Sequence, residues 1–307
     1  MKNINILFVG GSKRYSFAEK LIEAGKEFGL TIKIYSYEMG EDLPIADIAT
    51  VIQGKFFSSA EIMPHLELVV NKYSIDIAIP FHDQAIYLLA CLSEKVFVPT
   101  CNKSLISVFS SKINSSEFFK KHNIPFPPFS GKVPAIAKPD KGSASRGIKK
   151  FHRQSDLVDF LSSDKQSIYE IQDLVSGPEF SVDCYIAMDR KFKYFAIRQR
   201  LETLGGEVVK SRTVDMPSIK ILSDQILKIP GMRGAITLQV IHDERDDSYG
   251  LMEINPRFGG GMLTSWGAGV PWFHIMLRDY LGIAQEPVHH HNNMLMTRSF
   301  REHFFRG

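Results

Sequence analysis

Cysteine is scarce in this sequence, and no hydrophobic run is long. The three cysteines, Cys91, Cys101 and Cys184, are odd in number, widely separated and without metal-ligand spacing, so we expect reduced and mostly buried thiols. No apolar stretch approaches the roughly 18 residues of a membrane span. The first residues, MKNINILFVGG, have one lysine and a short apolar run that is typical of a first strand, not of a signal peptide. These absences predict a cytoplasmic protein that has no membrane partner.

An excess of charge of one sign is also missing. The formal net charge is +3 over 307 residues, and there is neither a Lys/Arg block nor a basic stripe interleaved with aromatic residues. We therefore expect no nucleic acid as partner. With 44% hydrophobic and 23% charged residues the composition is that of a globular protein, and the length allows two or three packed modules with an ample core.

The N-terminal region follows a strand, helix, strand pattern. A β-type run at residues 4–9 is followed by two glycines, by apolar residues at helical spacing up to residue 28, and by a second strand at residues 30–35. This order predicts a parallel sheet with helices on its faces. A dinucleotide site is not predicted, because the G-x-G-x-x-G fingerprint is absent. Glu38, just past the second strand, is either a ribose ligand or, in the interpretation that we favour, a solvated strand-end carboxylate.

Polar residues follow a later strand of the same predicted sheet. Strands are predicted at residues 75–80 and 96–99, with a helix around residues 86–92 between them. His82 and Asp83 come just after the first of these strands, where open α/β sheets place their ligands. They either contact the substrate or, in the favoured interpretation, Asp83 caps the following helix.

Two segments contain lysines at defined positions. Residues 104–123 are predicted to form two short helices, and Lys112 opens the second one, where a lone lysine is usually a surface residue. At residues 135–147, AIAKPDKGSASRG, a short strand contains Lys138 and ends at a proline before a loop of small residues. Small residues allow backbone N–H groups to approach phosphate oxygens beside Lys138, although the spacing is not that of a P-loop. A plain Gly/Ser turn between strands is the alternative.

A polar hinge follows this loop. The strand predicted at residues 168–175 passes through Ser176-Gly177-Pro178-Glu179 into the next strand, at residues 180–186. Exposed backbone at such a hinge can pair with an adenine edge, and Glu179 can bind both ribose hydroxyls. A polar β-turn is the alternative.

A basic hairpin comes next in the sequence. Strands are predicted at residues 194–200 and 207–214, on either side of two glycines. The cations on these strands are Arg198, Arg200, Lys210 and Arg212. So many cations on paired strands would repel one another unless anions lie between them.

The strongest pattern lies at residues 237–261, TLQVIHDERDDSYGLMEINPRFGGG, and predicts two strands joined by a polar turn. Because side chains alternate along a strand, Glu253 and Asn255 share one face, while Met252 points into apolar surroundings. Gln239 can join the polar face from the neighbouring strand. One carboxylate and two amide oxygens suit Mg²⁺, which takes its remaining ligands from water and substrate phosphates. The alternative is an antiparallel hairpin with one wet polar face.

In chain order, these candidates resemble the ATP-grasp superfamily. The motifs are L-M-E-I-N-P-R with Gln239 upstream and A-K-P-D-K-G-S-A-S-R-G, and the resemblance to the carbamoyl phosphate synthetase large subunit and to amino-acid ligases spans the whole chain. It implies an α/β pre-ATP-grasp domain with a parallel sheet at residues 1–108 and an α+β ATP-grasp fold at residues 109–307. That fold would divide into a small ATP-binding subdomain, residues 109–173, and a larger subdomain with the metal site, residues 174–307.

The resemblance also implies a role for each candidate residue. Glu253 and Asn255, helped by Gln239, would hold one or two Mg²⁺ ions, for which Mn²⁺ is an expected substitute. Catalytic roles would belong to Arg257, Lys138 and Lys210, with Arg257 steadying the transferring phosphoryl group or the acyl phosphate. The loop after Lys138 would fold over the phosphates of ATP, and the hinge would line adenine and ribose. The implied ATP ligands are Lys112, Lys138, Gly142, Ser143, Ser145, Arg146, Gly147, Gln172, Asp173, Leu174 and Glu179.

Two departures from the family pattern concern the metal and phosphate residues. Gln239 stands where the usual partner strand begins with an acidic residue, a variant shared with the carbamoyl phosphate synthetase branch, and this reduces the negative charge around a second metal ion. Ser111 precedes Lys112 where many relatives have Asp. No glutaminase domain or second ATP-grasp unit is present, which argues against complete carbamoyl phosphate synthesis.

The implied activity is ATP-dependent conversion of a carboxylate to an acyl phosphate, which an amine or another nucleophile then attacks. The expected partners are small-molecule carboxylate and amine substrates, and a homodimer is compatible with the sequence. A nucleotide-binding regulatory or sensor protein without turnover is the alternative, whereas an oxidoreductase fails on the missing glycine fingerprint. The presence of Glu253, Asn255, Arg257 and Lys138 together favours an enzyme, because a binding protein could lose Arg257 or a metal ligand without penalty.

Overall fold

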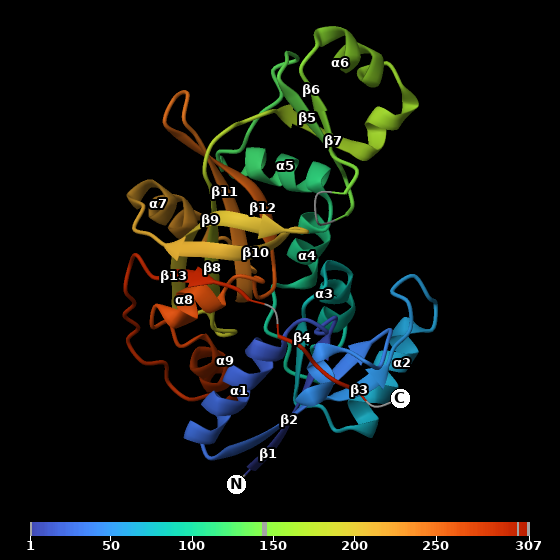
Figure 1. Cartoon of the computed structure of the whole chain (residues 1–307), viewed down its shortest axis with the longest axis vertical. Helices are drawn as coiled ribbons and strands as arrows, with labels where there is room; N and C mark the ends of the chain where they lie inside the picture. The colour runs from blue at the N-terminus through green and yellow to red at the C-terminus, as the bar shows by residue number, and fades with distance from the viewer. Residues whose placement is uncertain (1, 143–145, 300, 306–307) are drawn as a thin grey trace.

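Three β-sheets organise the chain, and they follow one another along its longest axis (Figure 1). The computed structural model describes residues 2–142, 146–299 and 301–305. The N-terminal four-stranded sheet lies at one end, the six-stranded sheet in the middle and the three-stranded sheet at the other end (Figure 1). Within the described ranges, no helix combines the length and the apolar character needed to cross a membrane.

The N-terminal sheet is parallel, as the strand, helix, strand pattern predicts, with the order β3-β2-β1-β4. Alternate residues of β1 enter different cores, since Ile6 and Phe8 pack with α1 whereas Leu7 and Val9 pack with α2. Both faces are therefore covered, which explains the unbroken hydrophobic run of this strand. The elements are β1 (Lys2–Val9), α1 (Tyr15–Glu27), β2 (Leu30–Glu38), η1 (Pro44–Asp47), β3 (Thr50–Gln53), α2 (Ile62–Lys72), β4 (Ile77–Pro80) and α3 (Asp83–Ala90).

The segment after α3 leads from the N-terminal sheet into the rest of the molecule. The strand predicted at residues 96–99 is only a single bridge to β4. Two short helices follow as predicted, α4 (Lys103–Phe109) and α5 (Lys112–Lys121). Each begins with a side-chain cap, from Asn102 and Ser111 respectively, which fixes the start of α5 at Lys112.

The middle sheet is antiparallel and contains the predicted metal hairpin, in the order β12-β11-β8-β9-β10-β13. One face packs on α4, α5 and α7 through apolar side chains such as Leu238 and Ile226. The short edge strand β13 is absent from the sequence prediction, because three residues give no recognisable period. The elements are β8 (Glu179–Ile186), β9 (Lys193–Leu204), β10 (Glu207–Thr213), α7 (Pro217–Leu227), β11 (Gly234–Asp243), β12 (Ser248–Asn255), α8 (Leu263–Gly267), α9 (Trp272–Leu281) and β13 (Leu295–Thr297).

The third sheet is small and has its own core. Its strand order is β6-β5-β7, and small residues of β5, Ala135 and Ala137, pack against Phe151, Leu157 and Phe160. The predicted strand with Lys138 is the central strand of this sheet. The elements are β5 (Ala135–Pro139), β6 (Lys149–Phe151), α6 (Gln154–Leu161), η2 (Asp164–Ile168) and β7 (Tyr169–Asp173).

An aromatic contact joins the N-terminal sheet to the segment that follows β12. The Phe17 ring of α1 meets Phe258 and Phe273 edge-on, with centroid distances of 5.3 and 4.8 Å. The Thr100 hydroxyl donates a hydrogen bond of 2.6 Å to the Pro256 carbonyl. Such edge-to-face pairs each add about 0.5–1.5 kcal/mol beyond area burial, so the end of the β11–β12 hairpin is held firmly on the N-terminal sheet.

Gly234, at the start of β11, offers a stability test. Its φ is +69°, and a Cβ there would lie too close to the backbone of Pro99 and Thr100, whereas Gly29 has a φ of +66° and open space around a Cβ. We expect Gly29→Ala to lower the free energy of unfolding by roughly 1–2 kcal/mol through left-handed strain. Gly234→Ala should cost roughly 1–3 kcal/mol more, because it also overpacks the contact. Thermal unfolding of both variants measures this, and equal losses would show that the neighbouring backbone relaxes freely.

Candidate active site

A cavity of about 910 Å³ lies between the three sheets and takes wall residues from each of them. Most of the predicted site residues meet there. Of the predicted set, the cavity is lined by Lys112, Lys138, Gly142, Arg146, Gln172, Asp173, Leu174, Glu179, Gln239, Glu253, Asn255 and Arg257. Gly147 and Lys210 do not line it, and Ser143 and Ser145 lie outside the described residues.

The predicted metal ligands form one polar cluster on β11 and β12. Gln239 pairs directly across the ladder with Glu253, and Thr237 pairs with Asn255. Among the described residues no three His, Cys, Asp or Glu side chains gather as a metal site, so the cluster offers one carboxylate and two amide oxygens. Burial, followed by the nearby charge of Asp83, raises the pKa of Glu253. A hard cation such as Mg²⁺ fits this donor set and would offset the cost of the enclosed carboxylate.

A β-bulge sets the direction of these ligands. Gln239 opposes Glu253 and Val240 opposes Leu251, so Met252 is an extra residue without an opposite partner. The prediction that Met252 points into apolar surroundings is wrong, because the bulge interrupts the alternation and Met252 lines the cavity. The bulge lets Leu251 stay in the core while Glu253 still faces the cavity.

Lys138 approaches the same cavity from the three-stranded sheet. Its Nζ donates a hydrogen bond of 2.8 Å to the Gln172 Oε1, and it lies opposite Glu170 in the β5–β7 ladder. Burial lowers the pKa of Lys138, although Glu253 opposes this shift and Lys112 adds to it. The Gln172 side chain therefore orients the lysine, a role that the sequence prediction of an adenine contact does not include.

Lys112 is placed by a carboxylate that the sequence analysis missed. Asp140 accepts hydrogen bonds from the Ser111 hydroxyl at 2.6 Å and from the Ile113 amide at 3.0 Å, which ties the start of α5 to the loop after β5. The Lys112 Nζ donates to the Gly142 carbonyl at 3.0 Å. Asp140 is therefore the acidic partner for the segment in which Ser111 replaces the usual Asp.

Two backbone amides at the hinge already donate hydrogen bonds to carbonyls of the segment before β5. The amides of Asp173 and Leu174 donate to the carbonyls of Pro128 and Pro134, at 2.7 and 2.8 Å. These two N–H groups are therefore paired within the fold, so the predicted adenine contact would use other backbone groups of the hinge. Val175, which the sequence analysis did not select, follows them on the cavity wall.

Arginines on β9 are paired with acids, as the charge argument requires. Glu179 lies opposite Arg200 on β9, with its Oε2 at 3.2 Å from the Arg200 Nε. Burial lowers the pKa of Arg200, while Glu179 opposes the shift. Both side chains line the cavity, so Glu179 remains on the wall where the ribose was predicted.

Lys210 is the predicted catalytic residue that the structure does not bring to the cavity. The β9–β10 ladder shifts register on both sides of Lys210, so the alternation expected from the sequence does not hold there. Its Nζ binds the exposed Glu202 at 2.9 Å instead. Lys210 therefore lies away from the cavity, and its catalytic role stays a prediction.

Arg257 is held by the N-terminal sheet. Its Nε and Nη2 lie 2.8 and 2.7 Å from the Asp83 Oδ1, across the gap between β12 and α3. The favoured prediction that Asp83 caps α3 is wrong in detail, because the His82 ring accepts from the Gln84 amide and is the cap. The ion pair with Asp83 keeps the Arg257 side chain extended on the cavity wall, beside the predicted metal ligands.

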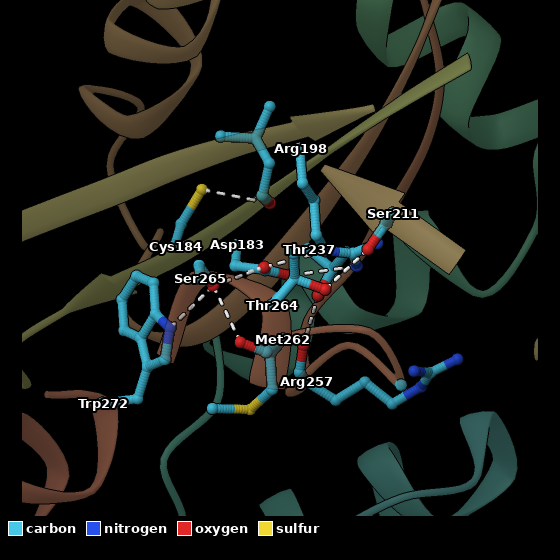
Figure 2. Close-up of polar contacts among 12 residues, drawn as sticks. Asp183, Cys184, Arg198, Ser211, Thr237, Arg257, Met262, Thr264, Ser265 and Trp272 are labelled. Carbon is cyan, nitrogen blue, oxygen red and sulfur yellow. Dashed lines mark hydrogen bonds and ion pairs between the residues drawn. The ribbon is translucent and has the colours of Figure 1, made fainter. Parts of the chain in front are cut away.

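A buried ion pair packs against the glycine run that follows Arg257, and Figure 2 shows the hydrogen bonds of this pair. Arg198, 1% exposed, donates to Asp183 through Nε and Nη2 at 2.9 and 3.1 Å. Ser265 also donates to Asp183, at 2.8 Å, and Trp272 donates to Ser265 at 2.9 Å. A Cβ on Gly261 would lie 2.5 Å from the Arg198 Nη1, so glycine is needed for this close approach. Figure 2 shows the Arg257 side chain extending away from this network.

The loop after β1 is closed by an internal carboxylate. Glu38 is buried and accepts a hydrogen bond of 2.7 Å from the Ser36 hydroxyl. Burial raises its pKa, while hydrogen bonds from Ser36 and from the amides of Gly11 and Ser12 oppose the shift. The favoured prediction of a solvated carboxylate is wrong, because these donors lie within the fold. The amides that a phosphate would use are therefore occupied.

Two further cavity residues escaped the sequence analysis. Arg14 donates to both carboxylate oxygens of Glu207, at 2.8 and 3.3 Å, and joins the loop after β1 to the start of β10. The partners are 193 residues apart, so no local pattern could reveal the contact. The only signal in the sequence is that the cations of the basic hairpin would repel one another without acidic side chains nearby.

Comparisons with known proteins agree with this architecture. A family model described as "ATP-grasp in the biosynthetic pathway with Ter operon" matches residues 170–301. The biotin carboxylase domain of 2-oxoglutarate carboxylase from Hydrogenobacter thermophilus is similar in structure, with a TM-score of 0.75 and 14% identity over 92% of this chain and 71% of that one. That structure was solved with MgADP, ADP and bicarbonate.

Other similar structures also come from ligase and synthetase enzymes. N5-carboxyaminoimidazole synthetase from Staphylococcus aureus, in complex with ADP, has a TM-score of 0.73 and 16% identity over 97% of this chain and 81% of that one. The L-amino acid ligase from Bacillus licheniformis has a TM-score of 0.70 and 14% identity over 92% and 75%. No curated protein has a matching sequence.

The raised pKa of Glu253 predicts a stability effect of pH. The folded protein holds this proton more tightly than the unfolded chain does, so stability falls as the pH rises from the ordinary carboxyl range through the raised pKa. Without metal, Glu253→Gln should therefore raise the melting temperature at about pH 8 and lose that advantage near pH 4. Glu244→Gln, exposed in the turn of the same hairpin, is the control. A lower melting temperature of Glu253→Gln at both pH values would contradict the prediction.

Proposed function

We propose that this chain, which has the ATP-grasp fold and matches an ATP-grasp family model over residues 170–301, is an Mg·ATP-dependent ligase that activates a carboxylate for attack by an amine or another nucleophile. One observation supports this proposal above the others. An oxygen-ligand cluster around Glu253 faces Lys112, Lys138 and Arg257 across a single cavity. Such a set of groups suits a metal-bound polyanion next to a site of charge development.

The proposed position of ATP follows from the two lysines and the hinge. Lys112 and Lys138 come from different elements but meet at the cavity between the small and middle sheets, where they would neutralise phosphate oxygens. Gln172, bound to Lys138, would orient it, and Glu179 would bind the ribose. The proposed domains are residues 1–108, 109–173 and 174–307, so that the nucleotide lies between the second and third.

Glu253, Asn255 and Gln239 would hold Mg²⁺ through one carboxylate and two amide oxygens. When bound, the ion neutralises phosphate charge and orients the terminal phosphoryl group for transfer. Glu253 supplies the only negative charge of this set, and its raised pKa means that metal affinity should rise with pH through that pKa. Lys138 balances the same carboxylate in the absence of metal.

Arg257 would bind oxygens of the carboxylate substrate and of the acyl phosphate. Asp83 holds two nitrogens on one side of the guanidinium, so the side chain is oriented before substrate arrives. A positioned cation in a largely enclosed cavity stabilises the charge of phosphoryl transfer without reorganisation during the reaction. One similar structure contains bicarbonate beside MgADP, and another is that of an L-amino acid ligase, which is compatible with a small carboxylate substrate.

The first test is turnover with pooled substrates. We expect ADP and phosphate to be released together only when ATP, Mg²⁺, a carboxylate and an amine are all present, because the carboxylate takes the phosphoryl group from ATP and the amine then displaces phosphate from the acyl phosphate. Glu253→Gln should abolish release and its Mg²⁺ dependence. Nucleotide binding without product release from any pool would favour the regulatory or sensor alternative, and unchanged Mg²⁺ dependence in Glu253→Gln would reject the metal site.

The second test concerns the shape of Arg257. Arg257→Lys should lower turnover by about a hundredfold, because a lysine cannot reproduce the planar fork that binds Asp83 and two substrate oxygens together. Arg245→Lys is the matched control, since Arg245 also makes a two-nitrogen contact with an aspartate, Asp243, on an exposed turn. Near-normal turnover of Arg257→Lys would mean that Arg257 only joins β12 to the N-terminal sheet.

A further inference from the structure

Two arginines, Arg14 and Arg298, contact one carboxylate on the cavity wall, that of Glu207. Arg14 binds both oxygens of Glu207, at 2.8 and 3.3 Å, and the Arg298 Nη1 lies 3.6 Å from the Glu207 Oε2. Arg298 is itself anchored, because its Nη2 donates to the Gly260 carbonyl at 2.6 Å. Two guanidinium groups from opposite ends of the chain therefore enclose one carboxylate.

The backbone below this carboxylate leaves room for it. A Cβ on Gly260 would collide with the Glu207 Oε2 and would lie 3.4 Å from the Arg14 Nη1. Gly260, Arg14 and Glu207 all line the cavity in which Arg257 lies. The surroundings of Glu207 therefore have the features of a carboxylate-binding subsite: two arginines, a backbone without side chain, and an opening into the cavity.

Glu207 is a carboxylate that can be displaced. Burial opposes its ionisation, yet Arg14, Arg298 and Arg257 together lower its pKa, so it stays charged. It is the first residue of β10 after the Gly205-Gly206 turn, and about one third of its side chain is exposed. Because the Glu207 side chain reaches solvent, it can turn outward and leave Arg14 to an incoming carboxylate.

We propose that Arg14 and Arg298 form a subsite for a second carboxylate of the substrate, which takes the place of the Glu207 carboxylate. The substrate is then an acid with two carboxylates, one activated beside Arg257 and the other bound by Arg14 and Arg298. This assignment rests on the proposed ligase function. The competing explanation is that the Arg14–Glu207 pair only joins the N-terminal sheet to β10.

The test compares succinate with butyrate, which have the same number of carbons but two carboxylates and one. Dissociation constants are measured by thermal stabilisation of the full chain, with and without Mg·ADP, at constant ionic strength. We expect succinate to bind about tenfold more tightly than butyrate, and Arg14→Gln to remove this difference. Lys13→Gln, an exposed lysine next in the sequence, removes the same charge and should leave the difference intact.

Glu207→Gln gives the opposite sign and separates the two explanations. Loss of the internal competitor should tighten succinate binding by about tenfold, while a simple joining role would change only the melting temperature. Equal binding of succinate and butyrate, a preference that survives in Arg14→Gln, or stabilisation by inorganic phosphate but not by succinate would each overturn the proposal. Failure of Mg·ADP to bind would reject the ligase proposal alone, because the acid preference is also measured without nucleotide.

Discussion

The ion pair between Asp183 and Arg198 is the contact on which the rest of the site depends. Two buried charges are costly unless they are paired, and removal of one partner from such a pair costs about 3–5 kcal/mol. Here Ser265 donates to Asp183 and accepts from Trp272, which links β8 and β9 to α8 and α9, while the Arg198 Nη1 has no hydrogen-bond partner among the described residues. Gly261 lies directly on Arg198, so the position of the glycine run follows from this pair. The backbone that passes through Arg257 is thereby fixed before any ligand arrives.

The N-terminal sheet is part of the site as well as a support for it. Asp83 orients Arg257, and Arg14 binds Glu207. Each of these two ion pairs joins the N-terminal part of the chain to the region of the middle sheet. The aromatic contacts of Phe17 also hold the N-terminal sheet against the segment that follows β12. Removal of the N-terminal sheet with its helices would therefore take Arg14 and Asp83 away from the cavity, and Arg257 would lose the carboxylate that orients it.

Local periodicity and chemistry together predict much of this molecule, and their limits are physical. The parallel sheet, the two short helices and the Glu253 hairpin follow from patterns within about 25 residues of sequence, where side-chain alternation and capping act. Asp83 and Arg257 meet across 174 residues, a pairing that depends on how the sheets pack. The position of Lys210 depends on bulges that shift the register of its ladder, and the burial of Glu38 depends on donors from the folded loop after β1, so neither is visible in a local pattern.

The bulge at Met252 divides β12 into two halves with opposite phase. Before it, Leu251 belongs to the core beneath the sheet, and after it Glu253 and Asn255 belong to the cavity while Ile254 returns to the core. A substitution that changes the packing of Leu251 therefore leaves the direction of the Glu253 and Asn255 side chains unaltered. Loss of a single residue at this point would turn the Glu253 and Asn255 side chains toward the core and the Ile254 side chain toward the cavity. Insertions and deletions are therefore far less tolerable here than replacements.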